Sequence, residues 1–164
     1  MLRAILYSAV IVFCLPGSSF AQEWTEWFHT ATEDPLTDRV TQVVKAQENQ
    51  YSPAFVYLAC NTEHTLIAFS DGRALFHRGN PRVSVRFDDG EVLDMGITND
   101  LRNPRFFVHT DRMVARFAEG LRSSSRLVFR IDQGRTHSLP LTGAAEALAQ
   151  LEAECELPVD KPLN

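Results

Sequence analysis

The chain has 164 residues, of which 45% are hydrophobic and 23% charged, and its formal net charge is −5 at pH 7. This length is that of one ordinary domain, able to bury roughly two-thirds of the surface that its unfolded chain exposes. An acidic chain without a basic run lacks the charge pattern of nucleic-acid-binding proteins, so we expect no nucleic acid among its partners.

The first 21 residues have the order of a secretory signal peptide. Arg3 is followed by an apolar run, a Pro-Gly break, and Ser19 and Ala21 at the −3 and −1 positions of a cleavage site. The run has about 12 residues, and a bilayer span needs about 20, so we expect cleavage rather than a membrane anchor. The sequence thus predicts a signal peptide over 1–21, a single periplasmic domain over 22–157 that does not span the membrane, and a flexible tail over 158–164.

Removal of the signal peptide would take Cys14 with it and leave Cys60 and Cys155. An even number of cysteines in an oxidising compartment favours a disulfide, and two cysteines allow only one intramolecular pairing. A redox enzyme would need the Cys-x-x-Cys spacing that tunes thiol reactivity, and the chain lacks it. We therefore predict a structural disulfide between Cys60 and Cys155, with free or intermolecular thiols as the alternative.

The charges are distributed unevenly along the chain. Residues 72–135 hold twelve arginines, no lysine and eight acids, whereas 22–71 and 136–164 are acidic. The planar guanidinium of arginine suits bidentate pairing with carboxylates and phosphates. Two interpretations remain open. The acidic ends of the chain balance the basic middle across the folded surface, or the arginines form a cationic face for a cell-wall polymer, a lipid headgroup or an acidic protein patch.

The first half of the domain predicts strands with one ambiguous segment. Residues 23–29 are rich in aromatic side chains and predict a first strand or a turn that caps the core, with a platform for a sugar or peptide as the minority interpretation. In 36–47 the valine spacing permits a helix, while the β-branched content favours a strand. The apolar runs over 55–60 and 65–69 predict strands buried on both faces. Residues 70–73 predict a hairpin turn, because Asp-Gly accepts positive φ angles.

The second half shows clearer alternation of apolar and basic side chains. Strands are predicted over 82–87, 91–97, 105–109, 126–131 and 137–141. Asp88-Asp89-Gly90 predicts the hairpin turn between the first two of them.

Two helices are predicted among these strands. Thr110 or Asp111 can cap the first helix, which has one apolar stripe. The second helix is predicted over 143–154, with Thr142 as its cap. The order of elements predicts an α+β fold, in which two helices pack on an antiparallel β-sheet meander and one disulfide links the parts.

The residues carry no recognisable catalytic motif. None of the five histidines lies in a metal-binding spacing, and no Gly-x-Ser-x-Gly nucleophile elbow is present. Asp88 and Asp89 are adjacent at a strand end and are interpreted as turn formers rather than an acid–base pair. We expect no catalytic residue, no metal and no cofactor. A cleft where His109, Asp111 and another polar side chain converge would instead favour an enzyme of unrecognised type.

The remaining candidate for a binding site is the outward side of two strands. Arg82 and Arg86 share one face of the first strand, and Arg126 and Arg130 share one face of the other. If the strands are near neighbours, the four guanidiniums form one patch. The alternative that we favour is a set of separate ion pairs with Asp and Glu, each of which contributes little.

Several segments carry a family resemblance through their order along the chain. They are Leu58-Ala59-Cys60, then Pro81 to Gly90 with an Arg-Phe-Asp strand end, then Phe106 to Leu121 leading into a helix, then Arg126 to Ile131, then Leu139 to Cys155. This order resembles the VasI/TagO-like type VI secretion-associated proteins, over residues 54–156. The resemblance implies a periplasmic, non-enzymatic accessory role and no catalytic residues. The closing strand and helix are also similar to invasion-associated locus B-type proteins.

These observations predict an exported, non-enzymatic accessory or binding protein of the bacterial envelope, with type VI secretion suggested by the resemblance. Its expected partner is an envelope protein or an anionic cell-wall or lipid component. Two alternatives stay open. One is an uncharacterised cell-wall-acting enzyme, and the other is a general periplasmic ligand-binding protein.

Overall fold

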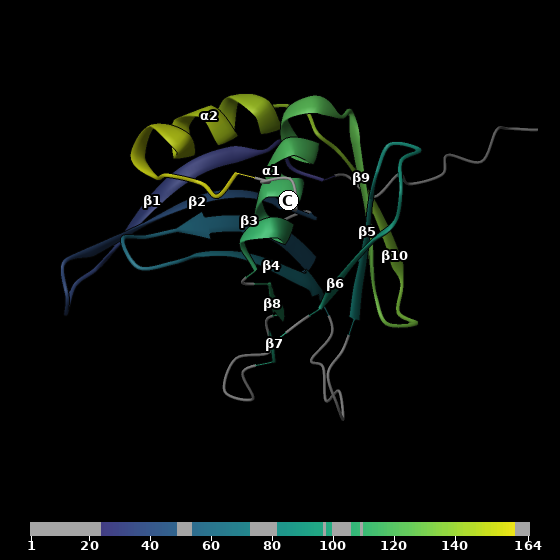
Figure 1. The fold of residues 1–164 in the computed structure, drawn as a ribbon, viewed down its shortest axis with the longest axis horizontal. Helices are drawn as coiled ribbons and strands as arrows, with labels where there is room; N and C mark the ends of the chain where they lie inside the picture. Colours follow the sequence, from purple (N-terminus) through teal and green to yellow (C-terminus); the bar gives the residue numbers. More distant parts are fainter. Residues whose placement is uncertain are drawn as a thin grey trace, which may run out of the picture.

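The computed structural model describes residues 24–48, 54–72, 82–96, 98–99, 106–108 and 110–159. Within these ranges the chain forms antiparallel strands in two sheets, together with two helices (Figure 1). The predicted α+β fold class is therefore confirmed, and the division of the strands into two sheets adds to it. The predicted signal peptide over 1–21 and the last five residues of the predicted tail lie outside the described residues.

The larger sheet has six strands in the order β1-β2-β3-β4-β8-β7. They are β1 (Phe28–Asp34), β2 (Arg39–Gln47), β3 (Ala54–Cys60), β4 (Thr65–Asp71), β7 (Thr98–Asn99) and β8 (Phe106–Val108). The ambiguous segment over 36–47 is a strand from Arg39 onward, because Val44 and Ala46 are fully buried on one face of β2 and Gln42 to Gln47 pair with β3. The element predicted over 23–29 overlaps only the start of β1.

The smaller sheet has four strands in the order β10-β9-β5-β6. They are β5 (Arg82–Phe87), β6 (Leu93–Gly96), β9 (Arg126–Ile131) and β10 (Thr136–Pro140). The predicted turn after β5 is confirmed, since Asp88 has a φ of 45° and β5 pairs with β6. At the turn predicted over 70–73, Gly72 adopts the positive φ that the prediction requires, at 79°, while 73–81 lie outside the described residues. The turn does not join β4 to the next described strand, because β4 pairs with β3 and β8 and β5 belongs to the other sheet.

Helices α1 (Asp111–Ser123) and α2 (Ala144–Glu154) cover the inner side of the six-stranded sheet (Figure 1). Neither is long and apolar enough to cross a membrane. Phe117 of α1 and Phe129 of β9 both contact Phe69 of β4, with ring centroids 5.8 Å and 5.5 Å from that of Phe69. All three rings are fully buried. The two sheets and α1 therefore share a single core.

Both helices begin without the predicted side-chain caps. Thr110 occupies the cap position of α1, but its side chain makes no capping hydrogen bond. At α2 the cap residue is Gly143 rather than Thr142, and it has a φ of 79°. A Cβ atom at this position would lie 2.8 Å from the carbonyl oxygen of Trp27. Glycine is required here by both the backbone conformation and the close approach of the chain.

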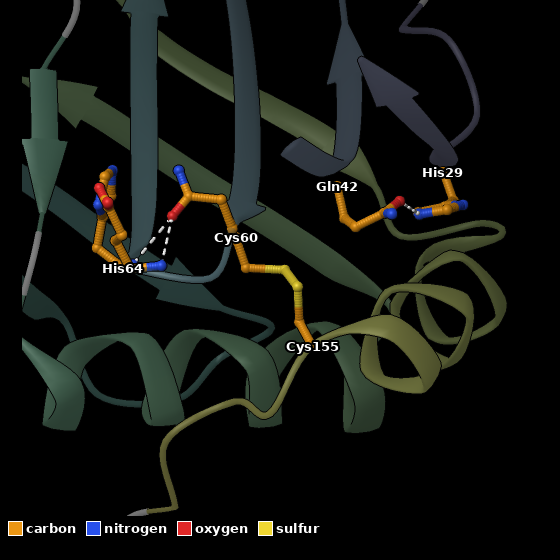
Figure 2. Close-up of a disulfide and its surroundings, with 7 residues drawn as sticks. His29, Gln42, Cys60, His64 and Cys155 are labelled. Carbon is orange, nitrogen blue, oxygen red and sulfur yellow. Dashed lines mark hydrogen bonds between the residues drawn. A yellow bond between two sulfur atoms is a disulfide. The ribbon is translucent and has the colours of Figure 1, made fainter. Parts of the chain in front are cut away.

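Cys60 and Cys155 form the predicted disulfide (Figure 2). Their Cα atoms are 6.4 Å apart, and the cysteines are separated by 95 positions in the sequence. The bond joins the end of β3 to the residue that terminates α2. Figure 2 also shows His29 and Gln42 nearby, where His29 Nε2 lies 2.9 Å from Gln42 Oε1. The disulfide thus fastens the last helix to the centre of the larger sheet.

Replacing Cys155 with serine should lower the free energy of unfolding by about 2 to 4 kcal/mol, because a disulfide that closes a long loop restricts the unfolded chain. This corresponds to a fall in Tm of roughly 5 to 15 °C for a domain of this size. Thermal denaturation followed by circular dichroism checks the value. Dithiothreitol should lower the Tm of the unmodified protein but leave that of a Cys60→Ser/Cys155→Ser control unchanged. Equal Tm values for the oxidised protein and the variants would contradict the prediction.

Candidate functional site

The register of β5 and β9 places the predicted arginines on a common surface. Ser84 pairs with Arg130, and Arg86 pairs with Val128. Every second residue of both strands is buried or half-buried on the inner side, whereas the arginines are exposed. The outer face of the four-stranded sheet therefore carries Arg82, Arg86, Arg126 and Arg130. We call these four residues the arginine face.

The arginine face is a zigzag line that crosses from one strand to the other. In the observed register Arg130 is the diagonal neighbour of both Arg82 and Arg86, and Arg86 is also the diagonal neighbour of Arg126. Diagonal neighbours on one face of an antiparallel pair are about 7–8 Å apart, within reach of long side chains. The sequence analysis predicted one arginine patch if the two strands were near neighbours. β5 and β9 are paired directly, so this condition is met.

Ion pairing accounts for one of the four arginines. Arg126 Nη2 lies 3.2 Å from Asp89 Oδ1, in a pair whose carboxylate side chain is 94% exposed. A pair so open to water contributes little to stability. Within the described ranges, the guanidiniums of Arg82, Arg86 and Arg130 form no ion pair. Among the described residues, the interpretation that we favoured from the sequence, a set of separate ion pairs, therefore holds for Arg126 and not for the other three arginines.

Acidic side chains frame the arginine face and hold its strands in place. Asp132 Oδ1 accepts a hydrogen bond from the backbone N–H of Arg82 at 2.7 Å. Asp94 Oδ1 accepts one from the hydroxyl of Ser84 at 3.1 Å. Asp132 thus interrupts the positive surface at its end, beside Arg82, and Asp94 interrupts it at its edge, on β6.

Asp88 is a structural residue, in agreement with its interpretation as a turn former. Its Oδ1 accepts hydrogen bonds from the hydroxyl of Ser125 at 2.7 Å and from the backbone N–H of Arg126 at 2.9 Å. The Ser125 hydroxyl, followed by the Ser125 backbone N–H, lowers the pKa of the Asp88 carboxyl below its usual value. Asp88 thereby ties the turn after β5 to the start of β9.

Sequence reasoning missed a buried polar pair where the two sheets meet. Glu48, which follows β2, and His137 of β10 are each 2% exposed, and His137 Nδ1 lies 3.8 Å from Glu48 Oε1. The His137 ring stacks on Phe129 at 4.8 Å, and Trp24 packs edge-on at 6.0 Å. The alternation of His137 with buried Leu139 along β10 was the one signal that could have placed His137 inside.

The N-terminal tryptophans belong to the core. Trp24 and Trp27 are 8% and 4% exposed, and Trp27 Nε1 donates a hydrogen bond to the carbonyl oxygen of Pro140 at 3.1 Å. For the two tryptophans this agrees with the main interpretation of the aromatic segment as core packing, whereas Phe28 of the same segment is 42% exposed. Buried rings are not available as a platform for a sugar or peptide.

A cavity of about 670 Å³ lies around the residues that follow the two cysteines in the chain. Its lining includes His64 and Asp111, with residues 156–159 on another side. His109, the partner that the sequence suggested for Asp111, lies outside the described residues. Among the described residues, no group of three or more His, Cys, Asp or Glu side chains could hold a metal ion. The unrecognised-enzyme alternative stays a prediction.

Comparison with known proteins adds no relationship. No family model matches the chain, and no curated protein or solved structure is significantly similar to it. The resemblance to the VasI/TagO-like proteins accordingly stays a prediction.

An Asp88→Asn variant tests the turn that supports the arginine face. The lowered pKa of Asp88 means that its ionised form stabilises the fold. Its contribution is fully present above the unfolded pKa of about 3.8 and is lost as the pH falls through the lower folded value. The variant should therefore melt at a lower temperature than the unmodified protein at pH 7, and the two should converge at strongly acidic pH. Thermal denaturation at a series of pH values measures this.

Asp89→Asn is the matched control, because the neighbouring carboxylate is almost fully exposed and makes one weak ion pair. Its Tm should stay close to that of the unmodified protein throughout. A Tm loss for Asp88→Asn that is independent of pH would show that the charge of Asp88 is not what stabilises the turn.

Proposed function

We propose that this protein is an exported, non-enzymatic binding protein of the bacterial envelope that docks on an acidic segment of a partner protein through the arginine face. The observation that carries the proposal is the line of four exposed arginines, three of which form no ion pair within the described part of the chain. The signal-peptide pattern over 1–21 and the disulfide support export, because disulfides persist in oxidising compartments. The family resemblance supports an accessory role, with type VI secretion as the apparatus.

The mixture of charges on this surface favours an acidic protein segment over a uniformly anionic surface. Asp94 and Asp132 lie beside the arginine face and would repel a lipid bilayer or a polyanion that covered the whole sheet. Separate carboxylates on an extended segment can instead pair with individual guanidiniums in the bidentate geometry that arginine provides. The zigzag spacing then selects partners by the positions of their acids.

The centre of the surface also offers apolar contact. Val128 lies opposite Arg86 on the same face and is half-buried. Arginine is enriched among the residues that dominate binding energy, especially where neighbouring groups exclude water from the contact. A partner that covers Val128 would remove water from the two central arginines, Arg86 and Arg130, and strengthen their pairing with its carboxylates.

The test is a charge-reversed Arg86→Glu/Arg130→Glu variant, compared with Arg112→Glu/Arg116→Glu on α1 as a control with the same change in net charge. Immobilised protein is incubated with bacterial envelope extract, and bound proteins are quantified by mass spectrometry. We expect one or more acidic proteins to bind the unmodified protein and the control, and to be depleted at least tenfold on the reversed variant. Higher salt should weaken this binding, since salt screens exposed charges.

Parallel assays separate the possible partners. Co-sedimentation with phosphatidylglycerol vesicles and with purified cell-wall sacculi, each repeated with the reversed variant, tests lipid and cell-wall binding. Arginine-dependent binding to either, with no protein lost from the reversed variant, would replace the proposed partner. Recovery of the same proteins by the reversed variant and the unmodified protein would refute the arginine face as the docking surface.

A further inference from the structure

The outer side of the six-stranded sheet contains a groove of about 550 Å³, formed by β1 to β4. Its floor follows from the register, in which Val43 pairs with Ala59 and Ala59 pairs with Leu66. All three side chains point away from the core side of the sheet, where Val44 and Leu58 are fully buried. Because Ala59 is small and stands between two larger residues, the sheet surface is hollowed at this position.

An aromatic wall stands beside this floor. Tyr57 is two residues from Ala59 on β3 and therefore lies on the same face, and its ring stacks on that of Phe55 with centroids 5.5 Å apart. Lys45 pairs with both Tyr57 and Phe28 in the neighbouring strands. Its Nζ lies 5.1 Å from the centroid of the Phe28 ring, which holds the ammonium group at the groove.

The opposite end of the groove is polar. Thr32 and Thr41 pair across β1 and β2, and Asp34 follows on the same face of β1. Asp34 Oδ1 accepts a hydrogen bond from the backbone N–H of Leu36 at 2.8 Å, and this bond lowers the pKa of the Asp34 carboxyl. The lining thus offers one cation, one carboxylate, one side-chain amide, one phenol and two threonine hydroxyls around an apolar floor.

We propose that this groove binds a neutral oligosaccharide, with a pyranose ring seated over Ala59 beside Tyr57. A pyranose has an apolar face of C–H groups and a rim of hydroxyls that both donate and accept hydrogen bonds. The floor and the aromatic wall suit the apolar face, whereas threonine hydroxyls, an ammonium and a carboxylate suit the rim. The volume lies within the range of about 300 to 1,000 Å³ that is typical of small-molecule sites.

Other occupants fit the lining less well. A fatty acyl chain would cover the hydroxyls of Thr32 and Thr41 with hydrocarbon and remove water from the charge of Asp34, which is costly. An anionic ligand would meet Asp34, and a cationic ligand would meet Lys45. Among these ligand classes, an uncharged polyhydroxyl compound is the one that meets no like charge and leaves no polar group unpaired.

This site is on a different sheet from the arginine face and does not depend on the function proposed above. The two sites can therefore be tested separately. The Arg86→Glu/Arg130→Glu variant should keep its sugar binding, and variants of the groove should keep the protein partner.

Titration of the ¹⁵N-labelled protein with the β-1,4-linked tetramers of N-acetylglucosamine and of glucose tests the proposal, with amide chemical shifts as the readout. We expect at least one tetrasaccharide to give saturable shifts centred on 41–47 and 55–59. Ala59→Phe should weaken binding at least tenfold, because the ring fills the hollow. Ala31→Phe is the matched control, since Ala31 is exposed on β1 and pairs with Gln42 on the other face of the sheet.

Thr41→Val provides a milder second variant, which removes one hydroxyl at nearly constant shape and should weaken binding several-fold. The dispersion of the amide spectrum shows whether each variant is folded. The absence of shifts in these strands with both tetrasaccharides would overturn the proposal. So would unchanged affinity in folded Ala59→Phe and Thr41→Val, or shifts of these amides with myristate but with neither sugar.

Discussion

The ring of Phe69 packs against those of Phe117 and Phe129, and this contact joins both sheets and α1 in one core. Once the inner faces of the two sheets are buried around this contact, alternation along each strand directs the remaining side chains outward. The arginine face and the groove are these outward sets, one on each sheet. The disulfide acts at the other end of the core, where it fastens α2 to β3.

Local patterns in the sequence predicted the parts of this structure that depend on neighbouring residues. Strict alternation in 82–87 and 126–131 identified β5 and β9 and the side on which their arginines lie. Asp88-Asp89-Gly90 identified the turn between β5 and β6, since it needs a positive φ at a short polar residue. The disulfide followed from counting cysteines, because two cysteines allow one intramolecular pairing. The strand and turn inferences use chemical preferences that act within a few residues. The disulfide inference instead eliminates every other intramolecular pairing.

The features that the sequence did not reveal depend on contacts between distant segments. Gly72 has the positive φ that its Asp-Gly pair allows, yet β4 and β5 join different sheets, and no pattern near the turn decides which strands pair. The apolar run over 55–60 suggested burial on both faces, whereas Phe55 and Tyr57 are half-buried beside the groove. A run of apolar residues has the same appearance whether its second face meets a helix layer or a ligand site.

The two proposed sites would recognise their ligands by different physical means. The arginine face acts through charge, which steers a partner from a distance and weakens as salt is added. The groove acts through shape and hydrogen bonding at close range. Its one cation and one carboxylate have opposite charges, so the groove carries little net electrostatic field. Both sites are formed by side chains of paired strands rather than by loops, so binding requires little ordering of the backbone. The buried Glu48–His137 pair helps to fix the register of β10, the strand beside β9. A shift of β10 by one residue would turn both His137 and Leu139 outward, so that Glu48 would lose its imidazole neighbour and the core would lose the Leu139 side chain.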